Sequence, residues 1–414
     1  MTTKHEPKLE QQFLTKNEVL RVTGLFTIWR SILFLMSMVA DRFLRYQPSF
    51  PYAETILEPS GLPRWFYSWA NFDGVHYLTI AEKGYVGTGL IQAFFPFFPS
   101  VLMRSLYLLT AGHINLVLTG MIITNAAALL ALLLWFSFLK SQFNIQKAYV
   151  GTLLLLFFPT SFFLVTYYTE SIFFAAIIGS FLLARRKHWL LAGLSCAVAT
   201  GTRVVGVFLL PALLLELWLQ WRSQQQQQPT LLRPVLSQVL DFTRSQWKNM
   251  LCVLVGSLGL IGYMAYLAKT FGDPLYFLHV QSEFGAGRTE GFVSYPQVLW
   301  RSIKILLTAE PWTLRYYTYV LEFLAGFIGL IGLLVASMKV RLSYIIFALG
   351  AFFTPTFTGT FSSMPRYILV CFPLYFILMN LLVDRPRLRT IILGVFSISL
   401  VVNTVMFIQG YWLS

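Results

Sequence analysis

The chain has 414 residues, of which 57% are hydrophobic and 12% are charged, and its mean hydropathy is +0.66. These values exclude an ordinary soluble globular protein. The net charge of +14 does not indicate nucleic-acid binding, because the basic residues gather at the ends of apolar segments, where they face anionic lipid headgroups.

Apolar segments recur along the whole sequence, and each must be helical because backbone polar groups in hydrocarbon bond only within the segment. We therefore predict an all-α polytopic membrane protein with about eleven transmembrane helices. Segments between residues 171 and 221 are short for a span, which indicates tilted or half-spanning helices. The predicted spans lie near residues 22–40, 114–138, 149–166, 171–184, 189–201, 204–221, 250–268, 317–337, 342–358, 366–383 and 391–411.

The distribution of Lys and Arg predicts the orientation of this bundle, because cytoplasmic loops retain positive charge during insertion. With residues 1–21 in the cytoplasm, the cytoplasmic segments hold 18 of the 31 basic residues. The opposite segments hold 10 of the 17 acidic residues. The polar segment 1–21 leads directly into the first span, which predicts an uncleaved anchor. Residues 22–414 are predicted to form a single transmembrane domain.

Two predicted outer loops, 41–113 and 269–316, are too long to be simple connectors, and long ordered loops usually carry function. The inner loop 222–249 contains a run of glutamines, which predicts a solvated cytoplasmic linker.

The segment Ile91–Leu109 is apolar but broken by Pro96 and Pro99. A twelfth span here would move the basic residues 185–187 outside. We therefore predict an interfacial or re-entrant helix within the first outer loop.

The first outer loop contains the densest polar cluster. If the segment is helical, Asp73, His76 and Tyr77 share one face. A carboxylate placed beside an imidazole can accept a proton from an attacking hydroxyl. A helix-capping Asp is an equal alternative, because one Asp-x-x-His spacing is a weak motif. Glu82 and Tyr85 follow in the same polar segment as candidate substrate contacts.

A second group of polar residues lies near the outer ends of spans: Glu170 with Ser171, then Arg203, then Arg366. A charged side chain near hydrocarbon costs roughly 2.5–3.5 kcal/mol, so each predicts a partner or a polar cavity. Arg203 and Arg366 have the planar fork that binds phosphate. The alternative is an internal salt bridge with Glu170.

The second outer loop contributes Gln281 and Arg288, which fit sugar contacts and solvated loop residues equally well. The three cysteines, Cys196, Cys252 and Cys371, lie in apolar segments and indicate core packing. We identify no metal-ligating residues and assign no cofactor, and the sequence leaves the need for a divalent metal open.

In these polar segments the chain resembles the PIG-V family, the mannosyltransferases that add the second mannose to glycosylphosphatidylinositol precursors, together with their prokaryotic relatives. The family pattern is Trp-Asp, a following His, Ile-Ala, Gly-Tyr, Ala-Phe-Phe-Pro, Tyr-Ser-Glu-Ser, Thr-Arg and Pro-Arg-Tyr. It is matched here by Phe72-Asp73, His76, Ile80-Ala81, Gly84-Tyr85, Ala93-Phe94-Phe95-Pro96, Tyr168-Thr169-Glu170-Ser171, Thr202-Arg203 and Pro365-Arg366-Tyr367.

The resemblance implies a GT-C architecture, with a catalytic Asp in the first outer loop and a polyprenyl- or dolichyl-phosphate sugar as donor. Asp73 matches the catalytic position. The implied reaction is an inverting transfer of a hexose to a hydroxyl of a glycolipid or other glycan on the non-cytoplasmic side. The resemblance implies that this hexose is mannose. Arg203 and Arg366 would stabilise the departing lipid phosphate.

The sequence departs from the family in two places. Phe72 replaces the Trp, and residues 86–92 lack the acidic residue that eukaryotic members carry after Gly-Tyr. The acceptor is therefore the least transferable property, and a bacterial plasma membrane is favoured over the endoplasmic reticulum.

The competing hypothesis is a non-enzymatic transporter or flippase of lipid-linked sugars. Transporters usually show paired repeats and polar groups near the bilayer midplane. Here the ionisable residues gather in the outer loops, which favours chemistry at a membrane surface.

Overall fold

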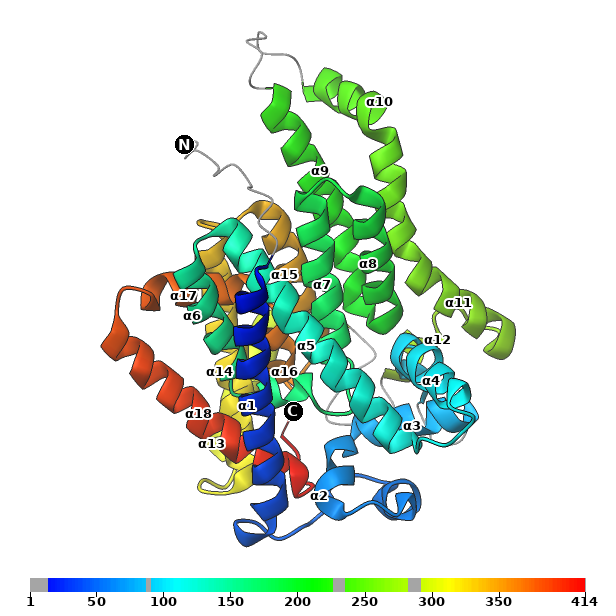
Figure 1. The fold of residues 1–414 in the computed structure, drawn as a ribbon, viewed down its shortest axis with the longest axis vertical. Coiled ribbons are helices and arrows are strands. Elements are labelled where there is room, and N and C mark those ends of the chain that lie inside the picture. The colour runs from blue at the N-terminus through cyan, green and yellow to red at the C-terminus, as the bar shows by residue number, and fades with distance from the viewer. Residues whose placement is uncertain (1–13, 87–90, 226–234, 282–291, 414) are drawn as a thin grey trace.

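The computed structural model describes residues 14–86, 91–225, 235–281 and 292–413. Over these residues the secondary structure is entirely helical, without a strand (Figure 1). The helices are α1 (Lys16–Val39), α2 (Arg64–Tyr67), α3 (Asp73–Lys83), α4 (Arg104–Leu109), α5 (Leu116–Gln142), α6 (Ile145–Leu156), α7 (Glu170–Arg185), α8 (Trp189–Thr202), α9 (Leu209–Gln225), α10 (Val235–Leu254), α11 (Leu258–Phe271), α12 (Tyr276–His279), α13 (Tyr295–Thr308), α14 (Leu314–Ser337), α15 (Leu342–Thr356), α16 (Met364–Tyr367), α17 (Pro373–Leu382) and α18 (Pro386–Ile408).

Six helical segments in the described part of the chain are long and apolar enough to cross a bilayer. A seventh is formed if α16 and α17, which meet at a bend of 79°, count as one broken span. The all-α polytopic membrane fold predicted from the sequence is confirmed. The six segments are Lys16–Arg42, Leu116–Gln142, Val204–Gln225, Leu236–Phe271, Leu314–Ser337 and Pro386–Ile408.

Each of the eleven predicted spans overlaps helix, but several differ from a full crossing. The predicted span 149–166 ends early, because α6 stops at Leu156 and an irregular segment with a 3₁₀ turn leads to α7. The predicted span 366–383 is broken before Pro373, which cannot donate a helical hydrogen bond. In the loop 222–249, predicted as a linker, α10 begins at Val235 and joins α11 in one long apolar helix.

Helix α7 forms the centre of the bundle and is buried along nearly its whole length between α5 and α8. Its apolar residues face other protein on all sides, which explains why this segment is helical without an amphipathic pattern. One end of α7 begins with Glu170 and the other ends with Arg185. The same helix therefore connects two polar regions at its opposite ends.

The described residues of 41–113, which were predicted as the first outer loop, fold into short helices that cover one end of the bundle, where α2, α3 and α4 lie opposite α9 and α10 (Figure 1). We call this the loop end. The first part of the segment predicted as an interfacial helix packs inward, since Phe98 is fully buried against Tyr77 and Tyr167, whereas Leu108 and Leu109 at its end are exposed. Asn71 ties the loop to α18 by donating to the backbone oxygens of Phe407 and Ile408, at 2.8 and 3.2 Å.

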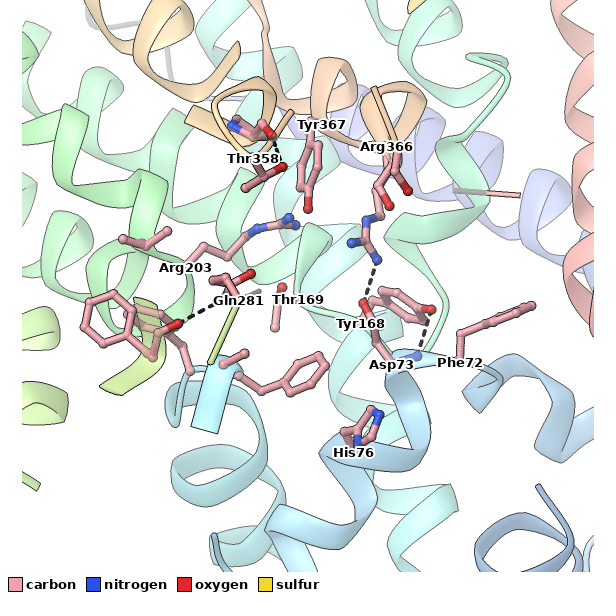
Figure 2. A pocket seen from close by; sticks show the side chains of 18 of the residues that line it. Phe72, Asp73, His76, Tyr168, Thr169, Arg203, Gln281, Thr358, Arg366 and Tyr367 are labelled. Carbon is pink, nitrogen blue, oxygen red and sulfur yellow. Dashed lines mark hydrogen bonds and ion pairs between the residues drawn. The ribbon is translucent and has the colours of Figure 1, made fainter. Parts of the chain in front are cut away.

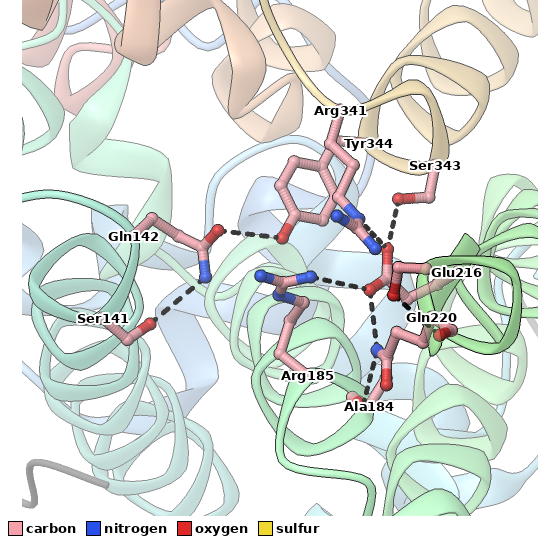
Figure 3. A network of polar contacts seen from close by, with 10 residues as sticks. Ser141, Gln142, Ala184, Arg185, Glu216, Gln220, Arg341, Ser343 and Tyr344 are labelled. Atoms are coloured by element: carbon pink, nitrogen blue, oxygen red, sulfur yellow. Dashed lines mark hydrogen bonds and ion pairs between the residues drawn. The ribbon is translucent and has the colours of Figure 1, made fainter. Parts of the chain in front are cut away.

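At the opposite end, which carries the start of α1, a closed polar network joins α7, α9 and α15 (Figure 3). The carboxylate of Glu216 has no exposed surface and accepts from Arg341 Nε at 2.6 Å and Ser343 Oγ at 2.7 Å. Arg185 and Gln220 also contact it, at 3.4 and 2.7 Å. These contacts compensate the loss of hydration that a buried charge otherwise pays.

Candidate active site

Asp73 is the first residue of α3, and the backbone before it adopts an unusual conformation. Phe72 has φ = 59° and ψ = −118°, a region that non-glycine residues rarely occupy and that costs on the order of 1–3 kcal/mol. The Phe72 ring is held among Phe50, Phe407 and Trp412, and the Asp73 N–H donates to Tyr168 Oη at 3.2 Å. Phe72 occupies the capping position, so Asp73 does not cap this helix.

Arg366 lies opposite Asp73 on the short helix α16, the first half of the broken span. Ser363, the residue before α16, has a left-handed conformation with φ = 66°, and Pro365 lies in the first turn of the helix. Arg366 Nη1 donates to Asp73 Oδ2 at 2.8 Å, and Arg366 Nε lies 3.4 Å from Glu170 Oε1. The helices α3 and α16, each of which follows a residue with strained backbone, therefore bring the Asp73 carboxylate and the Arg366 guanidinium together.

Arg203 completes the cluster at the sharp turn between α8 and α9. Its backbone is extended, and a 3₁₀ turn follows in which Gly206 approaches α8 so closely that a Cβ would lie 2.6 Å from the Ala199 carbonyl carbon. Arg203 Nη1 forms an ion pair with Glu170 Oε1. The internal salt bridge considered from the sequence is thus present, with Glu170 shared between Arg203 and Arg366.

These side chains line a cavity of about 1060 Å³ at the loop end (Figure 2). Arg203 and Arg366 lie along one side, with the Tyr367 ring between them at 5.2 and 5.4 Å from their guanidinium carbons. Asp73 faces them and keeps 27% of its side-chain surface exposed, while Glu170 keeps 1%. The accessible carboxylate is therefore Asp73, and Glu170 is a buried anchor for the arginines.

His76 and Tyr77 also line the cavity, one turn after Asp73. The His76 ring stacks on Phe94 at 5.0 Å. Burial lowers the pKa of His76, and the neighbouring Asp73 carboxylate acts in the opposite direction. Burial raises the pKa of Tyr77, so its hydroxyl stays protonated. Both rings therefore offer neutral hydrogen-bonding groups beside the carboxylate.

The loop 269–316, predicted as the second outer loop, reaches the same cavity through His279 and Gln281. The Asp273 carboxylate accepts from the Leu275 N–H at 2.9 Å and lies 2.6 Å from His279 Nδ1, a contact that lowers the pKa of Asp273. Gln281 donates to the Phe277 oxygen at 3.0 Å. Arg288 lies outside the described residues.

Three predicted contacts lie elsewhere. Glu82 is exposed, 3.8 Å from Lys83, and lines a second cavity of about 680 Å³ on the far side of α3. Tyr85 is buried, where its hydroxyl donates to the Phe94 oxygen at 2.7 Å and its ring packs on Tyr263. Ser171 is fully buried in the first turn of α7. Helical spacing points Glu82 away from Asp73, and packing explains the other two.

Sequence reasoning did not single out Tyr168 or Tyr367 as site residues. Tyr168 Oη also donates to the Asn71 oxygen at 3.3 Å, so it bonds to the backbone on both sides of Phe72. Both tyrosines lie beside motif residues, Tyr168 before Glu170 and Tyr367 after Arg366. Their positions beside these charged residues could have identified them as site residues.

Comparisons with known proteins give one finding. No protein-family model matches the chain, and no curated protein matches it. Among solved structures, the chain is similar to the crystal structure of ArnT from Cupriavidus metallidurans bound to undecaprenyl phosphate. The match covers 90% of this chain and 63% of ArnT, at 16% identity and a TM-score of 0.46. The chain thus spans less than two thirds of ArnT, and the resemblance to the PIG-V family stays a prediction.

Chemically, the cavity combines one accessible carboxylate with two guanidinium groups. A guanidinium has five N–H donors, so a bond to a carboxylate does not exhaust its capacity to bind a phosphate. In the described part of the chain, no three His, Cys, Asp or Glu side chains converge as metal ligands. The residues present therefore fit an anionic ligand beside a proton acceptor.

Proposed function

We propose that this protein is a membrane glycosyltransferase. It transfers a hexose from a polyprenyl- or dolichyl-phosphate sugar to a hydroxyl of a glycolipid or other glycan, at the non-cytoplasmic face. The observation that carries the proposal is the Asp73–Arg366 pair at 2.8 Å, facing a cavity large enough for a sugar and its acceptor. A flippase moves the lipid-linked sugar without transferring it, so its activity requires no proton acceptor.

In the proposed mechanism, Asp73 accepts the proton of the acceptor hydroxyl as its oxygen attacks the anomeric carbon. The new bond joins that oxygen to the sugar, and the bond from the sugar to the phosphate oxygen breaks. Its electron pair leaves with the lipid phosphate, and a single displacement inverts the anomeric centre. Arg366 and Arg203 stabilise the charge that grows on this leaving group.

The ion pairs already in the cavity define what the donor must do. Arg366 bonds to Asp73 through Nη1, so a phosphate that takes this same donor group competes with the carboxylate for it. Glu170 and Arg203 remain paired at the base of the cavity, which limits the excess charge there. Donor binding and release of the base are therefore coupled in this proposal.

Mannose is the donor sugar we propose, on the resemblance to the PIG-V family. The departure of the first loop from the pattern of the eukaryotic members supports a bacterial plasma membrane. His76 and Gln281 supply neutral polar groups for sugar hydroxyls. The acceptor class remains a glycolipid or glycan hydroxyl.

The test incubates purified protein in liposomes with polyprenyl-phosphate mannose and a set of glycolipid acceptors. We expect a covalent mannosylated product together with release of polyprenyl phosphate. Movement of the labelled lipid across the bilayer without formation of product would contradict the glycosyltransferase proposal and support a flippase.

A further inference from the structure

Glu322 is an ionisable residue in the third turn of α14, a helix long and apolar enough to span a membrane, and only 8% of its surface is exposed. It does not line the cavity that contains Asp73. Placing such a group near hydrocarbon costs several kcal/mol, and residues of this kind are usually retained for a function. Its contacts show which function this carboxyl group serves.

One contact of Glu322 supports the segment that carries Arg366. Glu322 Oε1 accepts a hydrogen bond from the Ser363 N–H at 3.2 Å. Ser363 is the left-handed residue that turns the chain into α16, and its own oxygen accepts from the N–H groups of Arg366 and Tyr367 at 3.0 and 3.1 Å. The carboxyl group of Glu322 therefore stabilises the strained residue Ser363, which precedes the helix that carries Arg366.

A second contact supports the segment that carries Asp73. The carboxyl group of Glu322 interacts with the side chain of Trp412, near the end of the chain. The Trp412 ring packs edge-on against Phe72 at 5.6 Å, and Phe72 is the strained residue that directly precedes Asp73. Thr318, one turn earlier on α14, donates to the Trp412 oxygen at 3.1 Å and fixes the same segment.

The surface of α14 next to Glu322 fits closely against the loop before α16. A Cβ added at Gly326 would lie 2.7 Å from the Phe361 ring, so only glycine allows this approach. Glu322 and Gly326 are four residues apart and share one helix face. Close packing and a buried acceptor thus act on the same loop.

We infer that Glu322 is a positioning residue that sets the distance between Asp73 and Arg366. It bonds to Ser363 in one strained segment and interacts with Trp412, whose ring packs against Phe72 in the other. Strained backbone persists only where its surroundings over-determine it. This role rests on the proposed function, because the geometry it maintains is that of the proton acceptor and the phosphate-binding arginine.

The test compares Glu322→Leu and Glu322→Gln with Tyr317→Phe, a matched control. Tyr317 lies on the same helix and donates to Asn403 Oδ1 at 2.8 Å, away from the cavity. Backbone hydrogen exchange over residues 360–367 and 409–413 gives the first readout. We expect faster exchange in both segments for Glu322→Leu, a smaller change for Glu322→Gln, which keeps one acceptor oxygen, and wild-type exchange for Tyr317→Phe.

The second readout is the Kd for undecaprenyl phosphate, used as the phosphate probe. Glu322→Leu should weaken binding about tenfold, because Arg366 loses its fixed position. Tyr317→Phe at a similar melting temperature should bind normally, which separates positioning from general stability. Wild-type exchange and wild-type Kd in Glu322→Leu would overturn the inference. If the wild-type protein does not bind the probe, the proposed function fails, and hydrogen exchange still decides the role of Glu322.

Discussion

Two clusters of carboxylates and arginines lie at opposite ends of α7, and they differ in access. At one end Glu216 is enclosed and bonds to Arg341, Ser343 and Gln220. At the loop end Asp73 retains exposed surface on a large cavity. Its partner Arg366 lies on a helix that follows the strained residue Ser363. The enclosed cluster has the form of a structural tie, whereas the open cluster has accessible groups for a ligand.

The comparison shows that ion pairs inside a membrane bundle need not serve one purpose. Removing one partner from a closed pair leaves an uncompensated charge, so its effect appears in stability. Removing a partner from an open cluster changes what can bind and react there. Substitutions in the two clusters should therefore separate stability from activity.

The largest effect is expected for Glu216→Leu. Arg185 and Arg341 would then face each other without the carboxylate, which should cost about 3–5 kcal/mol of folding free energy. Thermal unfolding in detergent measures it. The fraction that remains folded should keep its affinity for undecaprenyl phosphate, and a lost affinity with unchanged stability would reverse the assignment of the two clusters.

Next in size is Arg366→Gln, which removes the charge-assisted bonds that we assign to the donor phosphate. We expect Kd for undecaprenyl phosphate to rise about 10- to 100-fold, corresponding to roughly 1.5–3 kcal/mol. Arg366→Lys should restore little, because a lysine cannot reproduce the planar fork. Unchanged binding in both variants would remove Arg366 from the phosphate site.

A smaller effect is expected for Tyr168→Phe. The variant loses the hydroxyl that accepts from Asp73 N–H and donates to the Asn71 oxygen, each a bond of about 1 kcal/mol. The turnover number should fall roughly fivefold while donor affinity stays unchanged. A change in donor affinity alone would place Tyr168 at the phosphate and away from Asp73.

The smallest effect concerns pH and His76. Burial lowers its pKa below the usual 6.5, so the unfolded chain binds a proton more readily than the folded protein. This contribution to stability is complete above pH 6.5 and is lost as the pH falls through the lowered pKa. His76→Gln should therefore reduce the drop in melting temperature between about pH 7.5 and pH 5. An equal drop in both proteins would show that His76 does not titrate in this way.

Much of the fold was predictable from the sequence, because the bilayer imposes helix on every long apolar segment. The gathering of the site residues followed from their predicted position on one side of the membrane, with Asp73 in a long loop and Glu170, Arg203 and Arg366 near the ends of spans. A salt bridge with Glu170 was predicted as an alternative, whereas the pairing of Asp73 with Arg366 emerged only with the structure.

The remaining features depend on long-range packing. The strained Phe72 needs Phe407 and Trp412 from the far end of the chain. Glu322 lies in a span that reads as a plain apolar helix, and no local pattern connects it to Ser363. Arg185 was read as a topology signal in a loop, and its contact with Glu216 depends on α7 and α9 meeting in space.

The central claim is that Asp73 acts as the proton acceptor in a transfer from a lipid-phosphate sugar. Its most direct test measures transfer from polyprenyl-phosphate mannose and Kd for undecaprenyl phosphate in Asp73→Asn. Turnover should fall by about 10²–10⁴-fold. Affinity should be equal or tighter, because the carboxylate that competes for Arg366 is gone. Turnover close to that of the wild-type protein would contradict the claim.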